Sequence, residues 1–146
     1  MKKIGLLNGP NLDRLGKREP EVYGSVSLAE IEEKMKVKAT ACDCEVDAFQ
    51  SNHEGSIVDF IQESTPSADG VAINPGALTH YGVSLRDALQ DSKLPFVEVH
   101  ISNIHAREEF RHRSVLVDIA AGQIAGLGLN GYLYALDYLA GILKSS

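Results

Sequence analysis

The chain has 146 residues, 44% hydrophobic and 23% charged, which predicts one globular domain spanning residues 1–146. Its formal net charge of −6 argues against a general affinity for nucleic acid, because binding a polyanion requires a basic surface. No apolar segment approaches the roughly 20 residues that a membrane-spanning helix needs, and the start of the chain is too short for a signal peptide's apolar region, so we expect a cytoplasmic protein without a membrane partner.

Short apolar segments alternate with helical patterns along the chain. We expect strands at residues 3–8, 45–50, 70–74, 96–100 and 123–128, with helices from about residue 28 and at about 55–64, 81–90 and 131–144. Ser27 and Glu30 form a capping box that begins the first helix. Alternating strands and helices predict parallel strands with right-handed crossovers, so the expected fold class is a doubly wound α/β sheet.

The first strand is followed by a long irregular segment, residues 9–26, which is expected to be functional or mobile. Gly16 and Gly24 bracket charged residues and one aromatic, Tyr23, a composition typical of a lid at about residues 12–24. A phenol with its usual pKa of about 10 is a poor base, but a guanidinium nearby, such as that of Arg18, stabilises the phenolate. The alternative is an ordinary loop tyrosine packed over the core.

Four of the five expected strands end in polar residues. These segments are residues 8–11, 50–53, 74–77 and 100–103. Ligands of open parallel sheets bind beyond the carboxyl ends of the strands, so this pattern predicts a polar small-molecule site along that edge. Asn and Ser at such positions also cap helices without any ligand, which is the alternative for each end taken singly.

His100 ends an apolar strand two residues after Glu98, so both side chains should point to the same face. The carboxylate would then orient the imidazole and keep it protonated, as a general acid requires. The alternative is a hydrogen-bonded core histidine. We expect one of Arg107, Arg111 and Arg113 to pair with a substrate carboxylate, although a run of charges is more often a solvated helix face.

Three further patterns do not predict a bound group. The glycine-rich residues 126–131 match a dinucleotide-binding pattern but follow the last expected strand. The spacing of His100, His105 and His112 matches no zinc signature, and Cys42 and Cys44 are too close in the chain for a good disulfide. We therefore expect no metal and no cofactor.

Six blocks of the chain, in the same order, resemble the type II 3-dehydroquinate dehydratase family. They are residues 8–12, 16–24, 50–55, 73–77, 97–103 and 107–111. The resemblance implies a flavodoxin-like fold with a five-stranded parallel sheet, assembled as a homododecamer of four trimers. It also implies a hydro-lyase of the shikimate pathway that converts 3-dehydroquinate to 3-dehydroshikimate through an enolate, without Schiff base, metal or cofactor.

The resemblance also implies roles in proton transfer. Tyr23 matches the base that takes a proton from the carbon beside the ketone, and Arg18 matches the residue that stabilises its phenolate. His100 matches the acid that protonates the departing hydroxyl, and Glu98 the partner that orients it. Asn11 resembles the residue that holds a water against the enolate oxygen.

Substrate binding is implied at further positions. Asn74, His80 and Arg111 match residues that hold the substrate's hydroxyls, while Ile101 and Ser102 lie where its carboxylate is received. Asp87, on a later helix, matches a position that reaches a neighbouring subunit's site, which would make the trimer part of the catalytic unit.

Two other classes of function are the alternatives to this resemblance. A flavodoxin-like binding or receiver domain would carry a phosphate loop rich in Ser, Thr and Gly, or a phosphorylatable Asp, whereas the first strand here leads to Asn8-Gly9-Pro10-Asn11. A family member that had lost activity and served as a scaffold is the other alternative, but the residues matched to catalysis are all present.

Overall fold

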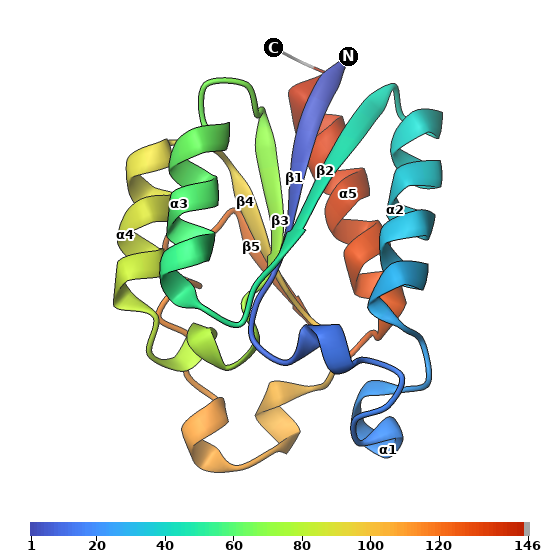
Figure 1. The fold of residues 1–146 in the computed structure, drawn as a ribbon, viewed down its shortest axis with the longest axis vertical. Helices are drawn as coiled ribbons and strands as arrows, with labels where there is room; N and C mark the ends of the chain where they lie inside the picture. The colour runs from blue at the N-terminus through green and yellow to red at the C-terminus, as the bar shows by residue number, and fades with distance from the viewer. Residues whose placement is uncertain (145–146) are drawn as a thin grey trace.

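Five parallel strands form one sheet, and helices cover both of its faces (Figure 1). The computed structural model describes residues 1–144. The strands are β1 (Lys2–Asn8), β2 (Cys44–Gln50), β3 (Gly70–Asn74), β4 (Phe96–His100) and β5 (Gly122–Ala125). Their order in the sheet is β2-β1-β3-β4-β5, which confirms the predicted doubly wound α/β class. The strand order reverses between β1 and β3, where such folds bind ligands.

The helices divide between the two faces of the sheet. The helices α2 (Leu28–Ala41) and α5 (Leu129–Leu143) cover one face, and α3 (Glu54–Ser64) and α4 (Val83–Ser92) cover the other (Figure 1). The predicted cap of α2 is confirmed, since the Glu30 amide donates to Ser27 Oγ at 3.2 Å. None of the helices in residues 1–144 combines the length and the apolarity needed to cross a bilayer.

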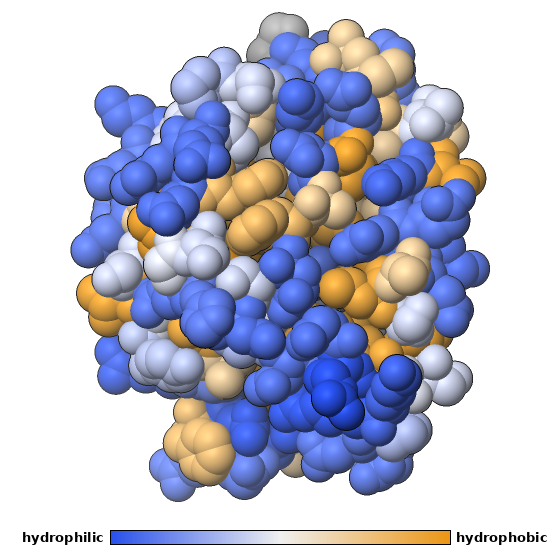
Figure 2. All heavy atoms as spheres, in the orientation of Figure 1, coloured by the Kyte–Doolittle hydropathy of each residue, from blue (hydrophilic) through white to orange (hydrophobic). Residues whose placement is uncertain are grey.

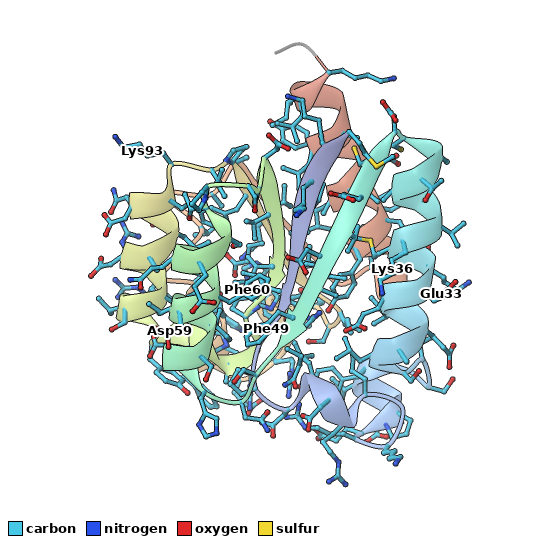
Figure 3. All side chains as sticks on the ribbon, turned by 45° about the horizontal axis from the view of Figure 1, so that its top comes forward. Glu33, Lys36, Phe49, Asp59, Phe60 and Lys93 are labelled. Carbon is cyan, nitrogen blue, oxygen red and sulfur yellow. The ribbon has the colours of Figure 1, made fainter. Side chains whose placement is uncertain are left out.

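Alternation along the strands builds a separate apolar core on each face. On β1, Ile4 and Leu6 pack with α2 and α5, while Leu7 packs with α3 and α4. At the β2 edge, Phe49 stacks on Phe60 of α3 with ring centroids 4.6 Å apart (Figure 3). Full burial of a side chain such as Ile4, Leu6 or Leu7 contributes about 1.5–3 kcal/mol to the free energy of unfolding, so packing on both faces stabilises the sheet.

The register brings the polar strand ends to one level. Asn8 of β1 is paired with Gln50 of β2 on one side and with Asn74 of β3 on the other. β4 continues to His100 beside them. The side chains that follow these strands therefore share one edge of the sheet, the lower end in Figure 1.

Three segments differ from the sequence expectation. β5 ends at Ala125 rather than at residue 128, because Gly126 and Gly128 have φ angles of 87° and 59°, which an extended strand does not have. The amides of these two glycines donate to the carbonyls of His100 and Ile101, so the glycine-rich segment is a turn that ties α5 to the end of β4.

The second difference lies in the segment after β1, which is not wholly irregular. It contains a 3₁₀ turn, Leu12–Arg14, and one short helix, α1 (Pro20–Tyr23). The charged segment after β4 likewise forms two 3₁₀ turns, Ile104–Ala106 and Glu109–Arg111, rather than one helix.

Candidate active site

A cavity of about 50 Å³ lies beyond the carboxyl ends of β1, β3 and β4. Its lining comprises Pro10, Asn11, Leu12, Arg18, Tyr23, Asn74, Gly76, Ala77, His80, His100, Ile101, Ser102, Ile104, Arg107 and Arg111. The surface over this end of the molecule is mostly hydrophilic (Figure 2). Nine of the eleven residues predicted for the site line this one cavity, and Glu98 lies directly behind it on β4.

The prediction that the end of β2 contributes to the site is wrong. Residues 50–53 do not line the cavity, because β2 is the edge strand and lies one strand away from the switch point. Its amides support the neighbouring loop instead. Gln50 Nε2 donates to the Gly9 carbonyl at 3.1 Å, and Asn52 Oδ1 accepts from the Asn11 amide at 2.9 Å. Asn11 is thereby held at a φ of 70° on the rim of the cavity, a conformation that asparagine tolerates.

Tyr23 lies between two arginines. The Arg107 Nη1 donates to the Tyr23 hydroxyl at 2.9 Å. The Cζ atoms of Arg18 and Arg107 lie 4.7 and 5.4 Å from the centroid of the tyrosine ring. The phenol oxygen thus accepts a hydrogen bond from one cation, and a second cation lies close to the same ring. Arg18 therefore lies beside Tyr23 as predicted, but the residue bonded to its oxygen is Arg107.

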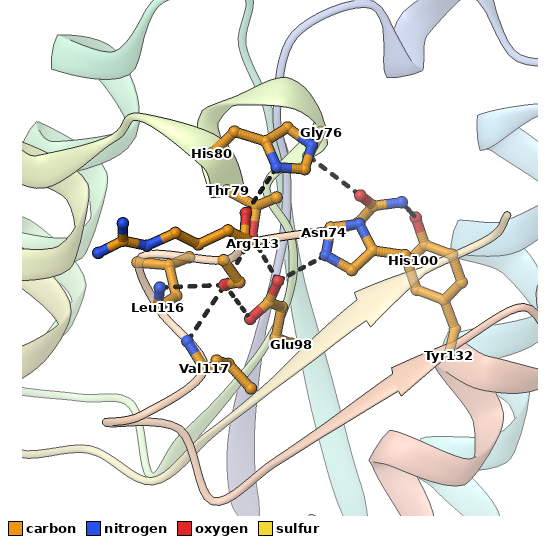
Figure 4. A network of polar contacts seen from close by, with 11 residues as sticks. Asn74, Gly76, Thr79, His80, Glu98, His100, Arg113, Leu116, Val117 and Tyr132 are labelled. Carbon is orange, nitrogen blue, oxygen red and sulfur yellow. Dashed lines mark hydrogen bonds and ion pairs between the residues drawn. The ribbon is translucent and has the colours of Figure 1, made fainter. Parts of the chain in front are cut away.

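His100 and Glu98 form a buried pair on one face of β4, as their spacing predicts. His100 Nε2 donates to Glu98 Oε2 at 2.5 Å, and Glu98 is fully buried. Ser114 Oγ donates to Glu98 Oε1 at 2.8 Å, and the Thr79 hydroxyl donates to Oε2 (Figure 4). With Nε2 held by the carboxylate, Nδ1 is the imidazole nitrogen left to exchange a proton with a ligand.

The hydrogen bonds of Glu98 decide its charge. Burial alone would raise the pKa of this carboxyl, but the donors around it outweigh burial, His100 first and then Thr79 and Ser114. The pKa of Glu98 is consequently below its ordinary value, and the carboxylate is ionised beside the imidazole. A buried negative charge is what stabilises a protonated histidine at this position.

Two more polar side chains are fixed from behind. His80 Nδ1 is 2.7 Å from the Arg113 carbonyl, so this nitrogen carries the proton and a neutral His80 presents Nε2 as an acceptor. Asn74 is buried, and its Oδ1 accepts from the Gly76 amide at 3.1 Å. Arg111 lines the cavity and is steadied by Glu108, whose carboxylate oxygens lie 3.1 and 3.2 Å from Nε.

Some placements were not foreseen from the sequence. Arg107 is one of the three arginines that the sequence offers for a substrate carboxylate, and no local pattern links it to a tyrosine 84 residues away. No sequence signal points to Thr79 in the 3₁₀ turn Gly76–His80 or to Ser114, although both hydroxyls reach Glu98. Asp87, predicted to act at a neighbouring subunit, is exposed on α4 and outside the lining of this chain's cavity.

The histidines of the segment after β4 do not form a metal centre. The rings of His105 and His112 lie 6.1 Å apart at their centroids, and His112 Nε2 donates to the Arg107 carbonyl at 2.9 Å. No group of three or more His, Cys, Asp or Glu side chains suited to a metal ion occurs within residues 1–144.

The fold and the site together define a class: a doubly wound α/β protein with a tyrosine between arginines and a histidine on a buried carboxylate, facing one small-molecule cavity. A sequence model of the family "Dehydroquinase class II" matches residues 2–140, and the chain belongs to that family. The resemblance of the sequence to the type II 3-dehydroquinate dehydratase family is thereby confirmed.

Individual relatives agree with this assignment. The 3-dehydroquinate dehydratase of Halothermothrix orenii is 56% identical over 144 residues, which cover 99% of this chain and 97% of that protein. The crystal structure of the type II dehydroquinase from Propionibacterium acnes matches with a TM-score of 0.93 at 42% identity, over 97% of both chains. That from Butyrivibrio crossotus matches with a TM-score of 0.92 at 47% identity, over 94% of this chain and 97% of that one.

Proposed function

We propose that this chain is a 3-dehydroquinate dehydratase, a hydro-lyase of the shikimate pathway that removes water from 3-dehydroquinate to give 3-dehydroshikimate. Family membership and the names of the close relatives support this function. The single observation that carries it is the presence, in one cavity, of a tyrosine oxygen bonded to Arg107 and a histidine bonded to Glu98. Elimination of water from a hydroxy ketone needs one base and one acid, and this pair supplies both.

Tyr23 is the base of the proposed reaction. Its oxygen takes the proton from the carbon beside the ketone, and the electrons of the broken C–H bond form an enolate. Arg18 and Arg107 favour the anionic phenol, as their distances from the ring and the hydroxyl support. Asn11, on the rim of the cavity, holds a water against the enolate oxygen in an oxyanion-type role.

His100 is the acid of the second step. The enolate re-forms the ketone, the C–O bond to the departing hydroxyl breaks, and a proton from His100 Nδ1 converts that hydroxyl to water. Glu98 orients the imidazole through Nε2 and balances its charge. No metal, cofactor or Schiff base takes part in this route.

The remaining polar groups hold the substrate. Asn74, His80 and Arg111 bind its hydroxyls, and Ile101 and Ser102, directly after β4, receive its carboxylate. All five line the same cavity, which supports these roles. The unprotonated Nε2 of a neutral His80 is suited to accept a hydrogen bond from a hydroxyl.

Residues 12–24 act as a lid. The cavity of about 50 Å³ is far smaller than the roughly 300 Å³ or more of typical ligand pockets, so Tyr23 and Arg18 must move to admit a six-membered ring. Gly16 and Gly24 flank the moving segment with φ angles of 89° and 80°, conformations that glycine adopts without strain. These two positions are the hinges of the lid.

The working form is a homododecamer of four trimers in the cytoplasm. Asp87 completes a neighbouring subunit's site in this arrangement, and its exposure on α4 supports that role. Large apolar side chains that this chain leaves exposed, such as Val83 and Phe110, are available for contacts between subunits.

The test of this function is an ultraviolet assay for the conjugated enone of the product. Purified protein with 3-dehydroquinate and EDTA should form the enone at the same rate as without EDTA, and the Tyr23→Phe variant should form none while still binding substrate. A well-folded oligomer that forms no enone would contradict the function and favour the scaffold alternative. More than a few percent of activity in the Tyr23→Phe variant would contradict the role of the base.

A further inference from the structure

A chain of hydrogen bonds runs behind the cavity from Asn74 into the core. Asn74 Nδ2 donates to the Tyr132 hydroxyl at 2.8 Å, and that hydroxyl donates to Asn8 Oδ1 at 2.7 Å. Figure 4 shows Tyr132 reaching from α5 to the Asn74 carboxamide beside His100. Tyr132 and Asn8 are fully buried, and Asn74 is 3% exposed where it meets the cavity. These three residues form a polar relay inside an otherwise apolar core.

The polarity of this relay is fixed by counting protons. A phenol has one proton to donate, and here it goes to Asn8 Oδ1, so the same oxygen can only accept from Asn74. Burial also raises the pKa of Tyr132 above its ordinary value, which favours the protonated hydroxyl. Asn74 therefore presents its amide nitrogen, not its oxygen, toward α5.

The other end of the Asn74 carboxamide is fixed as well. Its Oδ1 accepts from the backbone amide of Gly76. Reversing the side chain would place an NH₂ group against the Gly76 N–H, donor against donor, and would leave the Tyr132 hydroxyl to choose between two acceptors. Tyr132 on one side and Gly76 on the other thus select one of the two orientations that an asparagine side chain can adopt.

The selected orientation determines which hydrogen-bonding group Asn74 offers to a ligand in the cavity. One Asn74 Nδ2 proton is used by Tyr132, so the second remains for a ligand in the cavity that Asn74 lines. A donor at this position recognises the oxygen of a hydroxyl. The geometry points to Tyr132 as a positioning residue that presents Asn74 as a hydrogen-bond donor to a substrate hydroxyl, an inference that rests on the proposed function.

Asn8 provides independent evidence that the polar relay has a function. Its Nδ2 is buried and has no hydrogen-bond partner among the described residues. A buried, unpaired N–H reduces stability, and an apolar residue at the end of β1 would avoid the loss. The asparagine is explained by its Oδ1, which is the acceptor that orients the Tyr132 proton away from Asn74.

The test is a double-mutant cycle on the active oligomer. The Tyr132→Phe variant keeps the ring in the core and removes only the hydroxyl, and we expect kcat/KM for 3-dehydroquinate to fall by about tenfold, mainly through KM. Asn74→Ala should lower it at least as much, and the double variant should be no worse than Asn74→Ala alone. Tyr134→Phe, on the exposed side of the same helix, is the matched control and should match the wild type.

Two kinetic outcomes would overturn the inference: a Tyr132→Phe variant with wild-type kcat/KM, or losses from Tyr132→Phe and Asn74→Ala that multiply, as a purely structural role would give.

A crystal structure of the wild-type chain with 3-dehydroshikimate decides the question if the variant fails to fold. The Tyr132 hydroxyl should contact Asn74 while the Asn74 amide contacts a ligand hydroxyl, and an Asn74 side chain without ligand contact would overturn the inference. An inactive wild type that still binds the ligand in this way would refute the proposed function and leave the relay supported.

Discussion

At the scale of single residues, the site depends on charges that are held in place by neighbours distant in the sequence. Glu98 is ionised although fully buried, because hydroxyl and imidazole donors surround it. Tyr23 has arginines from two different loops beside its ring. Each of these supports is a separate side chain, so each can be removed while the proposed acid, His100, or the proposed base, Tyr23, is kept.

Removing a donor from Glu98 should change the pH dependence of catalysis. In Ser114→Ala or Thr79→Val the carboxylate loses a hydrogen bond that favours its charged form, so its pKa rises. We expect the acidic limb of the kcat/KM profile to move to higher pH, with less change at neutral pH. Rate measurements between pH 4 and 9 check this, and a profile that coincides with the wild type would contradict the role of these hydroxyls.

The same pair predicts how acid affects stability. The folded-state pKa of Glu98 is lowered, so its contribution to the free energy of unfolding is full above the ordinary carboxyl pKa of about 4.3 and is lost as the pH falls through the folded value. Glu98→Gln removes this contribution. Denaturant unfolding should show the wild type losing more stability than Glu98→Gln as the pH is lowered, and equal losses would count against an ionised Glu98.

Arg107 should contribute more to kcat than Arg18, although both arginines lie beside the proposed base, Tyr23. It donates directly to the Tyr23 oxygen, and removing one such donor from an anionic centre typically costs about 10²–10³ in kcat. Arg107→Ala should show a loss of this order, and Arg18→Lys a smaller one. In both variants, activity should appear only at higher pH, because the phenolate has lost stabilisation. Equal pH profiles for the variants and the wild type would exclude the arginines from this role.

Sequence patterns located the residues of the site but not all of their contacts. The pairing of Glu98 with His100 was predictable because period-two alternation is local. The bond from Arg107 to Tyr23 was not, because it joins loops that only the folded sheet brings together. Thr79 and Ser114 escaped for the same reason, since their hydroxyls have no periodicity and act through a carboxylate on another element.

At the scale of elements, the fold was more predictable than the points where elements end. The strand and helix alternation, the cap of α2 and the single parallel sheet were all expected. The end of β5 was misplaced because Leu127 and Gly128 continue an apolar pattern although the backbone has already turned. A positive φ at Gly126 is a property of the chain's path against β4, which hydrophobicity does not report.

This turn gives a prediction about stability. Alanine at Gly126 would have to adopt a φ of 87° and would bring its Cβ within 3.1 Å of the Asn103 Cβ, so Gly126→Ala should lose about 1–2 kcal/mol or more. Gly141→Ala is the matched control, because it lies in helix α5 with nothing within 4 Å of the added Cβ, and it should gain about 0.5–1 kcal/mol. Urea unfolding of both variants checks that their changes in the free energy of unfolding have opposite signs.

At the scale of the whole molecule, Asp87 lies outside the cavity of its own chain. If the neighbouring subunit's site uses this carboxylate, Asp87→Ala should lower kcat/KM by about tenfold without changing the mass of the oligomer. Asp91→Ala, at another exposed position of the same helix, should leave kcat/KM and the mass of the oligomer unchanged. Sedimentation together with the enone assay checks the pair, and a fully active Asp87→Ala oligomer would contradict the shared site.

The bond between Tyr132 and Asn8 also bears on the order of assembly during synthesis. It joins the end of the first strand to the last helix across 124 residues, so it forms only after nearly the whole chain has left the ribosome. Contacts so distant in sequence are slow to form, because much chain entropy is lost before they contribute. A nascent chain that ends before α5 has its first strand but not its oriented Asn74, and substrate binding should therefore be among the last properties that a growing chain acquires.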